Sequence, residues 1–196
     1  MKRKALTSLA IGLVIEALTP NKISTVSYVK AIKDLDIIKF VATAPILYSI
    51  YNSILIQDSD KALKIGYWIR RATKEVIDNP LIGTNTCLGY LILTIPIALA
   101  IRELDENAVG DPKVIVNKAT ELVLNYGSKE PATDFYEAIL IANPSYKGKY
   151  FGGVPDLSSK DASNYSLLDV LIESSYWDLI AYEVTHYYDI TCLLYT

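Results

Sequence analysis

Two long apolar segments constrain the fold of this chain more than any other feature of its sequence. Ile37–Ile56 and Leu88–Ile101 carry few charges, and neither shows the sustained alternation of apolar and polar residues that marks a half-buried strand. Ile37–Ile56 is long enough to span a bilayer, whereas the second segment is too short. Because Lys39 and Pro45 interrupt the first, we interpret both as helices buried on nearly all sides, with a membrane span as the alternative.

Helical periodicity continues through the rest of the chain. Apolar residues between Ala62 and Val76 recur at intervals of three and four, and Ser166 with Asp169 matches a capping box. The sequence therefore predicts one compact all-α domain over residues 1–196. It has about seven helices, with the segments 37–56 and 88–101 at its centre. The predicted helices lie near 3–18, 34–56, 60–78, 86–104, 112–126, 133–142 and 166–188, and the loops are 19–33, 79–85 and 143–165.

Composition excludes several classes of protein. The chain has 196 residues, 51% of them hydrophobic, and a net charge of −3, which excludes a disordered chain. A pI near 5.2 argues against a general nucleic-acid binder. The two cysteines cannot form a secreted disulfide framework, so we expect a reducing, cytoplasmic location.

The first eighteen residues allow two interpretations. Three basic residues precede an apolar run, as in a signal peptide, but Glu16 interrupts that run and the following Thr19–Lys22 is a poor cleavage site. We therefore predict a buried first helix. The last 36 residues hold six acids and no Lys or Arg, which indicates either a solvated acidic face or carboxylates that bind a divalent cation. The loop 143–165 is long enough for us to expect it to be mobile or functional.

Four ordered motifs carry a resemblance to a known family. They are Glu16–Pro20 followed by Lys22, Gly83–Gly89 (GTNTCLG), Asp134–Pro144 (DFYEAILIANP) and Asp178–Glu183 (DLIAYE). Together they resemble the motifs of archaeal-type members of the triphosphoribosyl-dephospho-CoA synthase family. The sequence departs from the family pattern at two histidine positions, where Ser27 and Cys87 stand, and its one histidine is His186. In the same alignment, Asp34 falls on the family's aspartate that follows the first of these positions.

The resemblance implies a reaction of ATP with dephospho-CoA that releases adenine. Such a substitution at the anomeric carbon of the ATP ribose needs a group that orients or deprotonates the attacking hydroxyl. It also needs Mg²⁺ and a cation to hold the triphosphate. The partners implied are ATP and a dephospho-CoA-like acceptor, with no nucleic acid and no membrane.

Each matched residue also has a structural interpretation. We expect Asp34 and Asp134 to be catalytic, Asp34, Asp134 and Asp178 to bind Mg²⁺, and Lys22, Asn85 and Thr86 to bind nucleotide; the structural alternatives are helix caps and solvated surface groups. We do not expect Arg70 or Arg71 to bind phosphate, because their helix is expected to expose them to solvent. Cys87 is expected to be a small buried residue rather than a nucleophile.

The sequence alone is compatible with two functions. The first is an active, Mg²⁺-dependent nucleotide transferase, and the second is a catalytically impaired paralogue that binds a nucleotide or a CoA-like ligand without turnover. The apolar C-terminal residues Leu193, Leu194 and Tyr195 also predict a homodimer with this tail at or near its interface.

Overall fold

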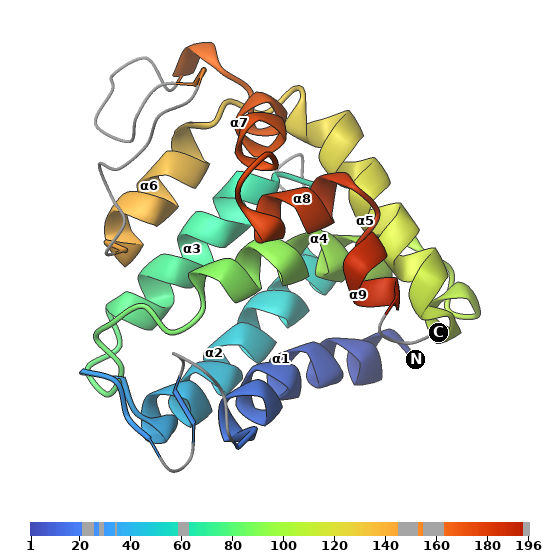
Figure 1. The fold of residues 1–196 in the computed structure, drawn as a ribbon. Coiled ribbons are helices and arrows are strands. Elements are labelled where there is room, and N and C mark those ends of the chain that lie inside the picture. The colour runs from blue at the N-terminus through green and yellow to red at the C-terminus, as the bar shows by residue number, and fades with distance from the viewer. Residues whose placement is uncertain are drawn as a thin grey trace.

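The protein is built from helices, as predicted. The computed structural model describes residues 1–20, 26–27, 30–33, 35–58, 63–144, 153–154 and 163–193. Within these ranges there is no strand beyond isolated bridges. The helices are α1 (Lys2–Leu18), α2 (Ile37–Ile56), α3 (Ile65–Ile77), α4 (Leu88–Glu103), the short 3₁₀ helix η1 (Ala108–Gly110), α5 (Pro112–Gly127), α6 (Thr133–Ala142), α7 (Leu167–Ser174), α8 (Leu179–Thr185) and α9 (Asp189–Leu193) (Figure 1).

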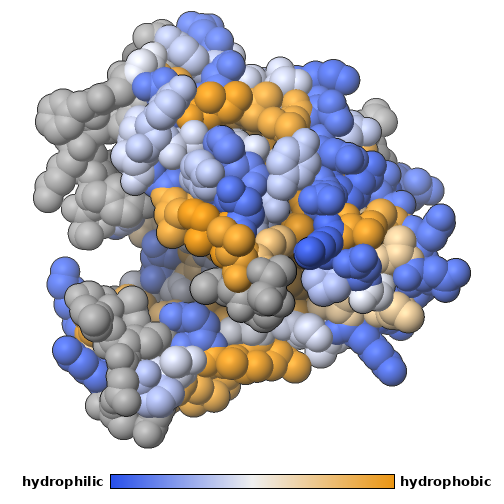
Figure 2. Space-filling model, turned by 45° about the vertical axis from the view of Figure 1, so that its right-hand side comes forward, coloured by the Kyte–Doolittle hydropathy of each residue, from blue (hydrophilic) through white to orange (hydrophobic). Residues whose placement is uncertain are grey.

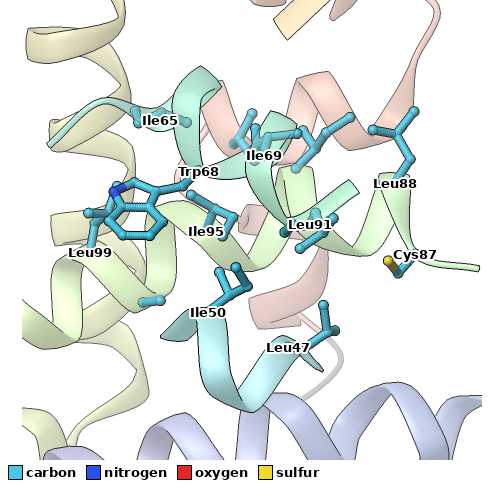
Figure 3. Close-up of a cluster of buried hydrophobic side chains, with 14 of the residues drawn as sticks. Leu47, Ile50, Ile65, Trp68, Ile69, Cys87, Leu88, Leu91, Ile95 and Leu99 are labelled. Carbon is cyan, nitrogen blue, oxygen red and sulfur yellow. The ribbon is translucent and has the colours of Figure 1, made fainter. Parts of the chain in front are cut away.

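Helix α4 is the centre of the core. Ten of its sixteen residues are buried, and it packs against α1, α2, α3, α5 and α8. In Figure 3, Ile50 of α2 points toward Ile95 of α4, Leu47 of α2 points toward Leu91, and the Trp68 ring of α3 lies beside Ile95 and Leu99. The prediction of a central helix over 88–101 is therefore confirmed, and its largely apolar sequence follows from neighbours on nearly every side.

Helix α2 buries one face rather than nearly all of its surface. On its buried face, the Thr43 hydroxyl lies 2.7 Å from that of Thr86, just before α4, and the Tyr51 hydroxyl lies 2.7 Å from that of Thr94 in α4. Its other face exposes large apolar side chains, including Ile38 (69%) and Ile56 (73%). Among the described helices, α2 is the one whose length and composition would allow it to cross a bilayer.

The predicted helix over 166–188 is the main element that the structure corrects. The Ser166–Asp169 capping box is present and begins α7, but the region is divided into α7 and α8, and the short α9 follows beyond residue 188. Asp178 begins α8 by accepting a hydrogen bond from the Ile180 amide at 2.8 Å. Each new start requires its own cap, because the first amides of a helix have no partner within it.

Side-chain hydrogen bonds, one of them long-range, stabilise the break between α8 and α9. Tyr187 and Tyr188 both adopt left-handed backbone conformations, with φ of 58° and 53°, which a continuous helix does not allow. The buried Tyr188 hydroxyl donates to the Leu93 carbonyl at 2.7 Å. The buried Glu183 carboxylate accepts the amides of Ile190 and Thr191 at 3.1 Å each.

Most of the predicted loop 143–165 lies outside the described residues. Of its middle, the structure describes residues 153–154, where the Gly153 amide donates to Glu173 of α7 at 2.8 Å. The predicted first helix is present as α1, which buries four side chains against its neighbours.

Candidate active site

The start of α4 carries the GTNTCLG motif, and its polar residues make structural contacts. The Asn85 side-chain oxygen accepts hydrogen bonds from the amides of Cys87 at 3.2 Å and Leu88 at 3.0 Å. Thr86 is buried, with its hydroxyl bonded to Thr43 of α2. Both residues thus lie at a helix N-terminus, as predicted. Their observed contacts cap α4 and join it to α2, and a nucleotide contact there stays a prediction.

Neighbouring helices cover this helix start closely. A Cβ atom added at Gly89 would lie 2.7 Å from Cδ1 of Ile180 on α8, so a larger residue here would require the end of that side chain to move. Lys22, the cation predicted to share this site, lies outside the described residues.

The cap can be tested separately from any ligand contact. Asn85→Ala should lower the free energy of unfolding by about 1 kcal/mol, because it removes the acceptor for two first-turn amides. Asn85→Asp keeps an acceptor in place and should lose much less. Urea unfolding followed by circular dichroism measures both. Equal losses in the two variants would show that the cap does not stabilise α4.

Cys87 behaves as a buried apolar residue. Burial raises the pKa of its thiol to about 12, against a smaller lowering by a hydrogen bond with Thr86, so the thiol stays protonated near neutral pH. Figure 3 shows its side chain at the edge of the apolar cluster, near Leu88. The prediction of a small buried cysteine is confirmed, and the thiol is not an activated nucleophile.

Asp134 lies where α6 packs against α3. Its Oδ1 is 2.8 Å from Nε of Arg70, and the Arg70 Nη1 is 3.3 Å from the Glu137 carboxylate. The Arg70 Nε does not meet hydrogen-bond geometry despite this short distance, so the pair is an electrostatic contact. Arg70, which we expected from the sequence to be solvent-exposed, is 33% exposed and joins two helices.

A buried carboxylate that sequence reasoning missed lies beside this pair. Glu130 is buried and accepts the amides of Ile65 at 2.8 Å and Tyr67 at 3.3 Å, so it caps α3 from 65 and 63 residues away. Burial raises the pKa of Glu130, while the hydrogen bonds from the α3 amides lower it and the charge of Asp134 raises it further; the net shift is upward. No local signal in the sequence identifies such a cap, because its partner helix is distant in the chain.

Gly66 makes the close approach of α3 and α6 possible. A Cβ atom at Gly66 would lie 3.1 Å from Glu130 Oε1, 3.3 Å from the Phe135 amide nitrogen and 3.4 Å from Asp134 Cβ. The first two of these distances are tighter than ordinary van der Waals contact, and the third is at its lower limit. The backbone of Asp134 is therefore fixed against α3 independently of its ion pair.

The two predicted metal ligands that the structure describes lie on different helices. Asp134 lies on α6 against α3, whereas Asp178 caps α8, which packs on α4. Asp34 lies outside the described residues. In the described part of the chain, no group of three or more His, Cys, Asp and Glu side chains is arranged to hold a metal ion. The convergence of the three aspartates stays a prediction.

These features define an all-α protein whose candidate site is a cluster of carboxylates around an arginine at the α3–α6 contact. A family model described as ATP:dephospho-CoA triphosphoribosyl transferase matches residues 3–195. The chain therefore belongs to this family, whose members are transferases that use ATP and dephospho-CoA. No significant match was found among curated proteins or among solved structures.

Proposed function

We propose that this chain, acting as one all-α domain, transfers the triphosphoribosyl group of ATP to a hydroxyl of dephospho-CoA and releases adenine. The observation that supports this most strongly is the family match, which extends over residues 3–195. The reaction breaks the bond between the ribose anomeric carbon and adenine, and forms a bond from that carbon to the acceptor oxygen. The hydroxyl proton leaves the acceptor, and adenine departs with the bonding electron pair and takes up a proton.

Asp134 is the group of this chain that we assign to the acceptor hydroxyl, together with Asp34. A carboxylate held at a fixed place can orient the hydroxyl and accept its proton as the new bond forms. The short distance to Arg70 and the tight packing at Gly66 support a fixed position for Asp134. The transition state should resemble an oxocarbenium ion, which a nearby carboxylate also stabilises.

Mg²⁺ fits the donor chemistry of the proposed site. Asp34, Asp134 and Asp178 offer hard carboxylate oxygens, and Mg²⁺ commonly takes only one or two carboxylates, with phosphate oxygens and water as its other ligands. When bound, Mg²⁺ would neutralise charge on the triphosphate. Lys22, Asn85 and Thr86 remain our proposed nucleotide contacts.

The activity is tested by chromatographic detection of adenine after incubation with ATP, dephospho-CoA and Mg²⁺. We expect adenine release that requires all three, with an equal amount of the triphosphoribosyl product detected by mass spectrometry. Nucleotide binding without adenine release would instead support the alternative of an impaired paralogue. The observation that favours this alternative is that Ser27 and Cys87 stand at positions where the family has histidine.

Asp134→Asn should lower kcat for adenine release by at least about tenfold, because the amide cannot accept the hydroxyl proton. Asp111→Asn is a matched control, since Asp111 caps α5 and asparagine caps helices equally well. We expect the control to keep its activity. An Asp134→Asn enzyme as active as the control would remove Asp134 from the site.

We further propose that the chain forms a homodimer and works in the cytoplasm. Apolar side chains gather in separate patches on the face shown in Figure 2, and Trp177, Leu179 and Leu193 are all exposed; Leu194 and Tyr195 lie outside the described residues. Light scattering at micromolar concentration should give twice the mass of 21.8 kDa, and a monomer mass would contradict the proposal. Cell fractionation without detergent tests the location.

A further inference from the structure

Arg70 connects two helices at the point where Asp134 is placed. It extends from the second turn of α3 to α6, with Nε 2.8 Å from Asp134 Oδ1 and Nη1 3.3 Å from Glu137 Oε2. Its guanidinium group also lies 6.0 Å from the centroid of the Tyr67 ring. Three neighbours on two helices thus restrict the guanidinium group, and its position restricts the Asp134 carboxylate in turn.

The surroundings of Asp134 leave its side chain with one main freedom. Its Cβ lies close to Gly66 and its helix begins beside the buried Glu130 cap, so the backbone cannot shift without disturbing the start of α3. Rotation of the carboxylate is what remains, and the arginine is the cationic group that the structure places against it. Arg70 therefore controls where the Asp134 oxygens lie.

A stabilising role alone does not account well for this arrangement. The side chains of Arg70, Asp134 and Glu137 are 33%, 29% and 51% exposed, and ion pairs this accessible to water contribute little to stability. The same contacts can nevertheless have a large effect on the reaction rate, because displacing a reacting group by about 1 Å can reduce the rate about a hundredfold.

We propose that Arg70 is a positioning residue of the transferase, which acts by holding the Asp134 carboxylate in its reactive orientation. This inference rests on the proposed function, in which Asp134 contacts the acceptor hydroxyl. It assigns to Arg70 an effect on kcat that is exerted through Asp134, and no direct contact with the triphosphate.

The test compares Arg70→Gln and Arg70→Lys with Arg71→Gln. Arg71 is a matched control, because it lies on the same helix but pairs with Glu75 and stacks over Trp68. We expect Arg70→Gln to lower kcat for adenine release by about tenfold or more, with KM for ATP changed less than about threefold. Arg70→Lys should recover part of the loss, and the melting temperatures of all three variants should stay within about 3 °C of the parent.

A double variant distinguishes positioning from an independent role. If Arg70 acts through Asp134, Arg70→Gln combined with Asp134→Asn should be no slower than Asp134→Asn alone. Multiplied losses would overturn the proposal, as would a large rise in KM for ATP at unchanged kcat, which would indicate a direct triphosphate contact. An active parent with an equally active Arg70→Gln would refute this inference alone, whereas an inactive parent enzyme would refute the proposed function as well.

Discussion

Trp68→Ala should lower the free energy of unfolding by about 3–5 kcal/mol, the range found when a large buried aromatic side chain is truncated. Trp68 is fully buried and lies between α3 and α4, with its ring among Ile65, Ile95 and Leu99 (Figure 3). Its removal would leave a cavity beside the central helix. The neighbouring helices cannot close it, because α4 is packed on several sides at once.

The other tryptophan provides the control for this experiment. Trp177 is 53% exposed, so Trp177→Ala should cost less than about 1 kcal/mol. Urea unfolding followed by far-ultraviolet circular dichroism measures both variants without depending on tryptophan fluorescence. Similar losses for the two variants would show that the α3–α4 contact is not the main part of the core.

The helices that could be predicted from the sequence are those determined by residues close together in the chain. The apolar content of residues 88–101 identified the central helix, and Ser166 with Asp169 identified the start of α7. Both signals depend on residues within one or two helical turns of one another. The left-handed pair Tyr187–Tyr188 has no such signal, because a hydrogen bond to Leu93, 95 residues away, helps stabilise it.

The same distinction explains what could be predicted of the candidate site. Asp134 was found through a motif, and Asn85 was correctly placed at a helix start. Arg70 and Glu130 were missed because their partners lie on other helices, 60 or more residues away in the sequence. From sequence alone, a charged residue on an amphipathic helix is expected to face solvent. The α3–α6 contact in the structure shows that Arg70 instead lies between two helices.

Glu130→Ala should lower the free energy of unfolding by about 2–3 kcal/mol, although it removes a carboxylate that is costly to bury. The Ile65 and Tyr67 amides would lose their acceptor at a buried helix start, and each buried amide left without a partner costs on the order of 1–3 kcal/mol. The relief of burying one charge offsets part of this loss. Glu130→Gln keeps an acceptor oxygen and should lose less.

The raised pKa of Glu130 also predicts how the stability of the protein changes with pH. Burial raises the pKa of Glu130 above its ordinary value of 4.5, so the folded protein holds this proton to a higher pH than the unfolded chain does. Between the two pKa values the folded state binds more protons, and stability therefore falls as pH rises. Relative to Glu130→Gln, the parent protein should be more stable near pH 4.5 than near pH 7. Urea unfolding of both proteins across this range measures the difference, and a difference that stays constant with pH would show that Glu130 is ionised in the folded protein as readily as in the unfolded chain.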